Sequence, residues 1–299
     1  MKKYIIILFV TLGLFSCEQV IPFDIVPSEN QLVVDAWITD ELKEQKVKLT
    51  LSQAYFDSTA LKPALGATVF LIKQDSTRIL LKDSKNNGEY SFKPNSKEYL
   101  KDGEFLSLYI KYQNDEFVSA AKLNRVPKID SVVFENSSTP NGPPDSKLPK
   151  EGFLGQFYAK DPIGEGDTYV IRKTINDTLK NKPNEYQLAY DAGFSPGSKS
   201  DGLTFILPIR QSITPGLFKD KDKLRVDIYS IPVEAYYFLL QVRQESQNGG
   251  IFATPLSNIP TNIFNRNTSS KTKALGAFIV SKVSSFETII DKSKAKPKK

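Results

Sequence analysis

The feature that most limits the fold of this chain is an alternation of apolar and polar residues with a period of two. Val47, Leu49 and Leu51 alternate with lysine and threonine, which gives an extended strand one apolar and one polar face. Between two such runs, residues 86–88 read Asn-Asn-Gly, a turn sequence that tolerates positive φ. Short strands at this spacing predict a mainly β fold, with an N-terminal immunoglobulin- or transthyretin-like β-sandwich over residues 30–126.

A second β-rich domain with one short helix is expected over residues 127–290. The helix is predicted near 232–247, because Pro232 suits the start of a helix and Asn248-Gly249-Gly250 suits its end. The lysine-rich residues 291–299 are expected to form a disordered tail. Strands of this domain are predicted at 153–160, 168–175, 203–209, 224–230 and 274–282.

The N-terminus predicts export and lipidation. Lys2 and Lys3 precede an apolar run over residues 4–14, which is shorter than the roughly 20 residues that a membrane-spanning helix needs. A charged start, a short apolar core and a small residue before the cut are typical of a secretory signal, here residues 1–16. Cys17 follows directly, so we expect it to carry diacylglycerol and palmitate as a membrane anchor, with residues 17–30 as a tether. No other cofactor is expected.

Composition narrows the possible functions. The chain contains no histidine, which excludes histidine-based triads and histidine metal sites. Cys17 is the only cysteine, so the mature chain cannot form an internal disulfide. The formal charge of +6 comes from lysines near the two ends, and the body between them carries about −1, which does not fit a nucleic-acid-binding face. The carboxylates show no cluster typical of glycoside hydrolysis. An enzyme is therefore not predicted.

Two segments are candidate sites. Asp161, Glu165 and Asp167 lie in a turn with glycine and proline, and their carboxylates suit calcium, although the spacing is not that of an EF-hand and an ordinary solvated turn has the same composition. An irregular segment before the last strand is either a loop that contacts a partner or ligand, or a structural wrap in which asparagines satisfy backbone groups. The residues of this second candidate are Phe252, Pro255, Asn258, Asn262 and Phe264.

A set of short motifs, taken in order, resembles one known family. The motifs are the lipidation signal with Glu18 after the cysteine, Val34-Asp35-Ala36-Trp37-Ile38, Gly66-Ala67, Gly88-Glu89-Tyr90, Pro127-Lys128-Ile129-Asp130, Asp161-Pro162, Gly249-Gly250-Ile251-Phe252, Pro255, Asn258, Asn262-Ile263 and Ala274-Leu275-Gly276-Ala277-Phe278. The set is similar to the lipoproteins of domain-of-unknown-function family 4249, and the resemblance covers nearly the whole mature chain.

The resemblance implies a lipoprotein of the outer membrane, exposed at the cell surface, that accompanies a SusC-like TonB-dependent receptor. The expected function is that of an accessory or capping partner that assists substrate capture. The alternative is a non-catalytic structural subunit of a larger outer-membrane β-barrel assembly for protein insertion or export. Any role shared with SusD-like partners would be one of position and not of fold, because those proteins are helical and this chain reads as β-rich. The family provides no catalytic residues to carry over.

Overall fold

The computed structural model of the 299-residue chain describes most of the predicted mature region. The described residues are 30–54, 57–96, 99–138, 150–214, 216–250, 253–255 and 257–297. The predictions for the signal peptide, for Cys17 and for all of the tether before Asn30 therefore lie outside the described residues. Among the residues that are described, no helix has both the length and the apolar character needed to cross a membrane.

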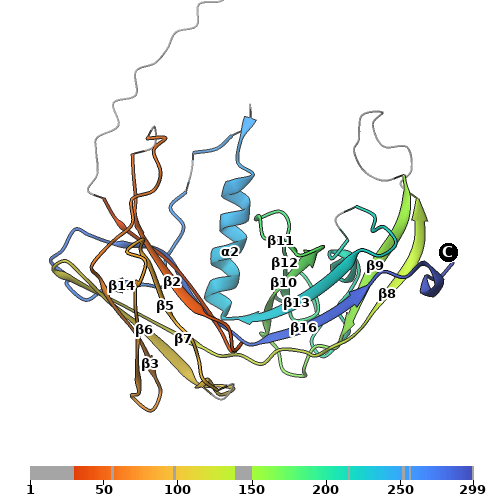
Figure 1. The fold of residues 1–299 in the computed structure, drawn as a ribbon, viewed down its shortest axis with the longest axis horizontal. Coiled ribbons are helices and arrows are strands. Elements are labelled where there is room, and N and C mark those ends of the chain that lie inside the picture. Colours follow the sequence, from red (N-terminus) through yellow and green to blue (C-terminus); the bar gives the residue numbers. More distant parts are fainter. Residues whose placement is uncertain are drawn as a thin grey trace, which may run out of the picture.

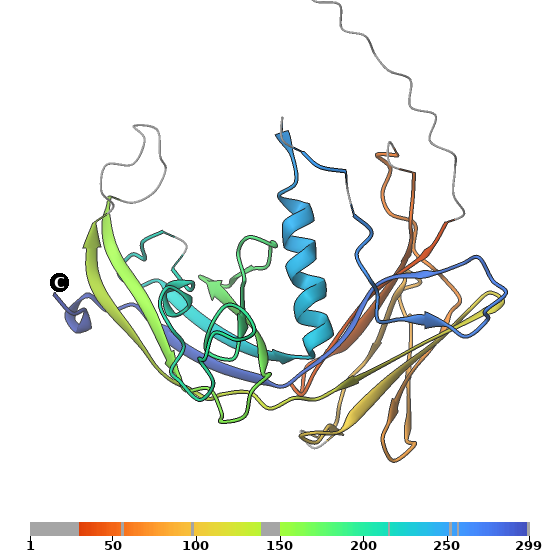
Figure 2. The ribbon, with the colours of Figure 1, turned by 180° about the vertical axis from the view of Figure 1, so that it is seen from behind.

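The chain is mainly β, as predicted, with 45% strand and 9% helix. Two β-rich lobes lie side by side, and helix α2 (Val233–Ser246) stands between them (Figures 1 and 2). The predicted helix is thus confirmed, with Pro232 at its N-cap.

The first lobe is a sandwich of two sheets. One sheet has the order β15 (Ala274–Ser281), β1 (Leu32–Thr39), β2 (Gln45–Leu51) and β5 (Glu89–Phe92). The other has the order β14 (Phe264–Asn265), β7 (Asp115–Lys122), β6 (Phe105–Tyr112), β3 (Thr68–Lys73) and β4 (Arg78–Leu81). The alternation in the sequence sets the core between the sheets, since alternate residues point inward and are almost fully buried: Leu32, Val34, Ala36 and Ile38 of β1, and Leu106, Leu108 and Ile110 of β6.

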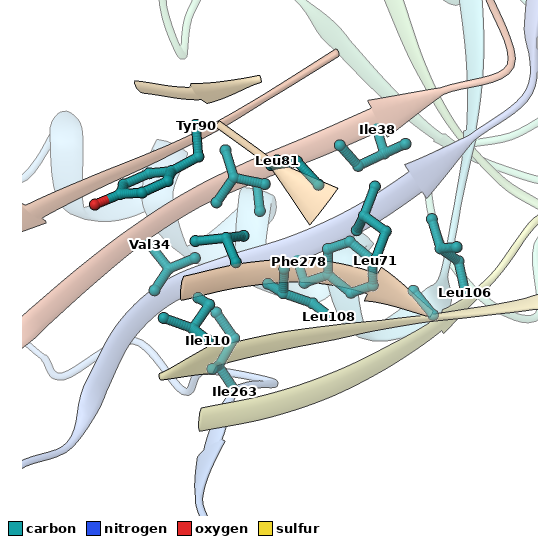
Figure 3. Packing of buried hydrophobic residues seen from close by; sticks show 14 of the residues in the cluster. Val34, Ile38, Leu71, Leu81, Tyr90, Leu106, Leu108, Ile110, Ile263 and Phe278 are labelled. Atoms are coloured by element: carbon teal, nitrogen blue, oxygen red, sulfur yellow. The ribbon is translucent and has the colours of Figure 1, made fainter. Parts of the chain in front are cut away.

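The C-terminal part of the chain completes this first sandwich. Strand β15, which the sequence places in the second domain, pairs in parallel with β1 along its whole length. Phe278 of β15 and Ile263 pack into the core with Leu71 and Leu108 of the opposite sheet (Figure 3). The boundary drawn at residue 127 therefore does not separate the two lobes cleanly, because a period-two pattern identifies a strand but not the strand that it pairs with.

The second lobe contains a five-stranded sheet and a long hairpin. The sheet has the order β11 (Thr178–Lys180), β10 (Thr168–Ile175), β13 (Lys223–Ile231) and β16 (Val283–Ile289), with β12 (Gln187–Tyr190) also paired to β10. The hairpin consists of β8 (Ile129–Ser138) and β9 (Glu151–Ala159). A second core, with Phe157, Tyr169 and Phe205 at its centre, lies between these elements.

Two predictions for the second lobe are wrong. Residues 203–209 do not form a strand but run through turns into the short 3-10 helix η2 (Ile209–Gln211), where Pro208 has no amide hydrogen to give to a sheet. The expected disordered tail is ordered through residue 297: after η4 (Lys292–Lys294), Lys296 pairs with the edge of β8 through the backbone of Phe134 and Asn136.

Helix α2 joins the two lobes through a third core. Its buried residues Ala235, Tyr236 and Leu239 pack with Ile279 of the first lobe and Tyr229 of the second. Nearby, Trp37 meets Tyr229 edge to face, at 5.7 Å between ring centroids. The lobes therefore share buried side chains and are not connected by a linker alone.

Candidate functional site

The described surface contains a groove of about 1540 Å³. Its floor is the outer face of the sheet that contains β3, β6 and β7, and the first turns of α2 form one wall. Residues 260–266, which belong to the irregular segment before β15, close one end. The groove therefore brings together elements that are far apart in the sequence.

The strand alternation explains which side chains line the groove. In β6, Leu106 and Leu108 point into the core, so Phe105 and Tyr109 point outward. An outward sheet face is expected to be polar in a soluble sandwich, yet this one also carries Phe70 of β3. Phe105 is 52% exposed on this face, whereas Phe70 and Tyr109 are half-buried, with 6.4 Å between their ring centroids.

Lysines give the groove a positive rim. Lys111 and Lys122 are exposed and line it, and neither has an ion-pair partner within 4.0 Å among the described residues. Glu116 also lines the groove, but Arg266 holds it in an ion pair at 3.1 Å. Glu116 lies opposite Lys111 in the β6–β7 pair, and Glu234 of α2 adds a second carboxylate to the groove lining.

Some residues of the predicted partner-contact segment line the groove, and one of them also forms the structural wrap that was the other interpretation. Asn262 lines the groove, but its side-chain amide donates to the carbonyl of Phe278 and its side-chain oxygen accepts from the Phe278 amide, which is the structural wrap. Phe264 is 65% exposed at the end of the groove, where it pairs with Val118 of β7. Pro255 and Asn258 are exposed and do not line the groove, and Phe252 lies outside the described residues.

The predicted calcium set is not the set of carboxylates that the structure brings together. Asp161 lies with Asp191 and Asp201, and one oxygen of each falls within 4.8 Å of the others. Asp167 instead pairs with Arg125 at 2.6 Å, and Glu165 is exposed on the turn. Since Asp191 and Asp201 follow thirty or more residues later, the local spacing around Asp161 contained no signal for this cluster.

Hydrogen-bond donors within the protein contact the carboxylates of Asp161 and Asp191. Tyr169 donates its hydroxyl to Asp161 at 2.6 Å, and the Gly202 amide donates to the other oxygen at 3.2 Å. Asp191 accepts the amides of Gly166 and Asp167. Burial raises the pKa of Asp161 to about 6, although the hydrogen bonds from the Tyr169 hydroxyl and the Gly202 amide lower it. Hydrogen bonds within the protein therefore already use both oxygens of Asp161 and one oxygen of Asp191, and they connect the loops that carry these residues.

The fold and the groove define the class of this molecule: a two-lobed, mainly β protein with an open apolar groove at its surface. The family model described as "Domain of unknown function (DUF4249)" matches residues 18–287, and the chain belongs to that family. A search of curated proteins finds no similar sequence. Two motifs of the resemblance, Val34-Asp35-Ala36 and Gly276-Ala277-Phe278, lie opposite each other in the β1–β15 pair.

Proposed function

We propose that this protein is a lipid-anchored outer-membrane protein, exposed at the cell surface, that acts as an accessory or capping partner of a SusC-like TonB-dependent transporter and assists substrate capture. The lipidation signal that ends at Cys17 supports the anchor, and the family membership supports the partner. The protein contributes binding and position in this role, and no catalytic step.

The observation that carries the proposal is the groove. Its volume of about 1540 Å³ exceeds the roughly 300–1,000 Å³ of sites for small ligands. Exposed apolar side chains that adjoin one another on a soluble protein are typical of a surface that contacts another macromolecule. A capping partner needs such a surface to contact its receptor.

The test is an affinity pull-down of the tagged, lipidated protein from native outer membrane, followed by mass spectrometry. We expect one SusC-like receptor at equal stoichiometry. Phe105→Glu, which places a charge on the floor of the groove, is expected to reduce recovery of the receptor at least tenfold. Ile163→Glu is the matched control, because Ile163 is 79% exposed in the second lobe and does not line the groove.

Two results decide against the proposal. Recovery of no large β-barrel receptor would reject it. Recovery of a multi-subunit complex with barrel-assembly or secretion proteins would favour the alternative, a structural subunit of an assembly for protein insertion or export.

A further inference from the structure

One end of the first sandwich is the part of the described structure closest in sequence to the proposed lipid anchor. Asn30 follows Cys17 by 13 residues, and strand β1 starts two residues later, at Leu32. A chain of 13 residues spans at most about 45 Å when it is fully extended. An anchor at Cys17 therefore keeps this end of the sandwich within that distance of the bilayer.

Four chain segments lie side by side at this end. Leu32 of β1 pairs with Leu51 of β2, and the Leu51 amide donates to the Lys62 carbonyl at 2.8 Å. On the other side of β1, the Leu32 amide donates to the Lys273 carbonyl at 3.2 Å. The loop after β2 rises beside the start of β1 (Figures 1 and 2). Since neighbouring strands are roughly 4.8 Å apart, the backbones of Lys273 and Lys62 flank the start of β1 at about one and two strand spacings.

The second sheet of the sandwich contributes to the same end through the turn between β14 and β15. The Arg266 amide donates to the Glu116 carbonyl of β7 at 2.7 Å, and the Lys273 amide donates to the side chain of Gln31. Lys111 lies opposite Glu116 in the β6–β7 pair. Both sheets therefore present side chains at this end.

The cations of this end are exposed. In the part of the chain that the structure describes, they are Lys62, Lys111, Arg266, Lys271 and Lys273. Of these, only Arg266 has an ion-pair partner within 4.0 Å among the described residues, and that partner is Glu116. Leu61 and Leu65, on either side of Lys62, are 55% and 40% exposed. Lysines beside exposed leucines are typical of a surface that contacts lipid head groups.

The carboxylates of this end are less exposed than the cations. The described ones are buried or half-buried, and each accepts a hydrogen bond from a nearby donor: Asp57 from Thr59, Asp83 from Gly88, Asp115 from Ser270 and Glu116 from Arg266. The exposed charges of this end are therefore positive, which is complementary to an anionic lipid surface.

We propose that this end of the first sandwich lies against the bilayer that holds the lipid anchor. Its five cations contact anionic, phosphate-bearing head groups, and Leu61 and Leu65 enter the interface between head groups and acyl chains. This inference rests on the anchor of the proposed function, and it names the surface that faces the membrane. The groove runs from Lys111 at this end to Phe105 at the other end of β6, so it stands upright on the bilayer and faces a neighbour in the same membrane.

The first measurement removes the lipid, so that only the protein surface is tested. The mature chain, residues 18–299, is produced without signal and lipid and is sedimented with vesicles of phosphatidylcholine, with or without phosphatidylglycerol. We expect at least tenfold stronger binding when phosphatidylglycerol is present. High salt should abolish this preference, because it screens exposed charges.

Matched triple variants test the location. Lys62→Gln, Lys271→Gln and Lys273→Gln together should weaken binding to phosphatidylglycerol vesicles at least twentyfold, since each lysine near an anionic surface contributes about fivefold. The control replaces three exposed lysines of the second lobe that have no ion-pair partner among the described residues: Lys182, Lys199 and Lys219. It should bind as the unchanged chain does. Equal urea midpoints of the two triple variants exclude an effect through folding.

The second measurement tests orientation in the lipidated protein. A fluorophore is attached at Ser58→Cys in the loop after β2, or at Ser76→Cys in the β3–β4 turn at the opposite end of the sandwich. Lipidation of Cys17 leaves no other free thiol, because Cys17 is the only cysteine of the chain. In vesicles that contain phosphatidylglycerol and brominated lipid, we expect the label at residue 58 to be quenched at least twofold more than the label at residue 76.

Several outcomes overturn the inference. They are equal binding to both kinds of vesicle, equal losses in the two triple variants, and quenching at residue 76 that equals or exceeds quenching at residue 58. Protection of residues 61–65 by the receptor and not by vesicles would assign this end to a protein partner and would also reject it. Recovery of the receptor without vesicle binding rejects only this inference, whereas vesicle binding without the receptor rejects only the capping role.

Discussion

Gly276 shows how one residue fixes the pairing of two distant strands. Its φ is +91°, which side chains other than hydrogen rarely tolerate, and a Cβ there would overlap the backbone carbonyl of Val34. We predict that Gly276→Ala lowers the free energy of unfolding by about 2–4 kcal/mol, because the clash pushes β15 away from β1. Urea denaturation followed by tryptophan fluorescence measures this change.

Gly66→Ala separates the cost of a side chain at positive φ from the cost of a Cβ clash. Gly66 has a φ of +75°, but a Cβ there would meet nothing within 4 Å. Its replacement should therefore cost only the backbone term, about 1 kcal/mol. If both alanine variants lose the same stability, the close approach of β15 to β1 is not what requires glycine at position 276.

Asp161 makes stability depend on pH. Its pKa is raised to about 6 from the ordinary value of 3.8, chiefly by burial, so the folded state holds a proton that the unfolded state has lost between pH 4 and 6. The contribution of this group is fully present below pH 4 and is lost as pH rises through 6. We predict that the contribution of Asp161 to the free energy of unfolding falls across this window.

Asp161→Asn should remove this downward contribution from the pH dependence of the free energy of unfolding. The amide oxygen can accept from Gly202 and the amide nitrogen can donate to the Tyr169 hydroxyl, so both contacts remain without a titrating group. Urea unfolding at several pH values between 4 and 7 gives the slope. Glu165→Gln, an exposed carboxylate of the same turn, is the control that should leave the slope unchanged. An unchanged slope in Asp161→Asn would contradict the assignment.

At the scale of elements, helix α2 packs against both lobes. Leu239 is buried in the third core with Ile279 of β15 and Tyr229 of β13. We predict that Leu239→Ala costs about 2–4 kcal/mol, because it leaves a cavity where three elements meet. Hydrogen exchange should accelerate in both β13 and β15, since the two strands lose the same neighbour. Tyr237→Ala is the control, because Tyr237 is half-exposed on the groove side.

The elements also show how far a sequence can be interpreted. Most strands were predictable within a few residues, since the alternation that buries Leu106 and Leu108 is local. Helix α2 was predictable from Pro232 and its apolar spacing. Residues 203–209 were not, because a short apolar run with a proline is compatible with an edge strand or with a turn, and only packing against β9 decides between them.

At the scale of the whole molecule, the lipid anchor that we propose at Cys17 is expected to set where the protein resides. We predict that Cys17→Ser prevents lipidation, so that the protein is recovered in the soluble fraction and not in the outer membrane. Fractionation with immunoblotting and mass spectrometry of the N-terminal peptide measure both effects. Ser16→Ala, which keeps a small residue before the cut, is the control and should remain in the membrane. Membrane retention of the Cys17→Ser protein would contradict the anchor.

The sequence by itself determined the class of fold, the helix and the identity of the family, because strand alternation, helix caps and short motifs are local properties of the chain. It also indicated Phe264 as a residue of interest. Tertiary structure alone decided that β15 belongs to the first sandwich, that Asp161 meets Asp191 and Asp201, and that Phe264 closes a groove floored by β6 and β7. Each of these joins residues far apart in the sequence, and the pairing of distant strands depends on packing that no local pattern records.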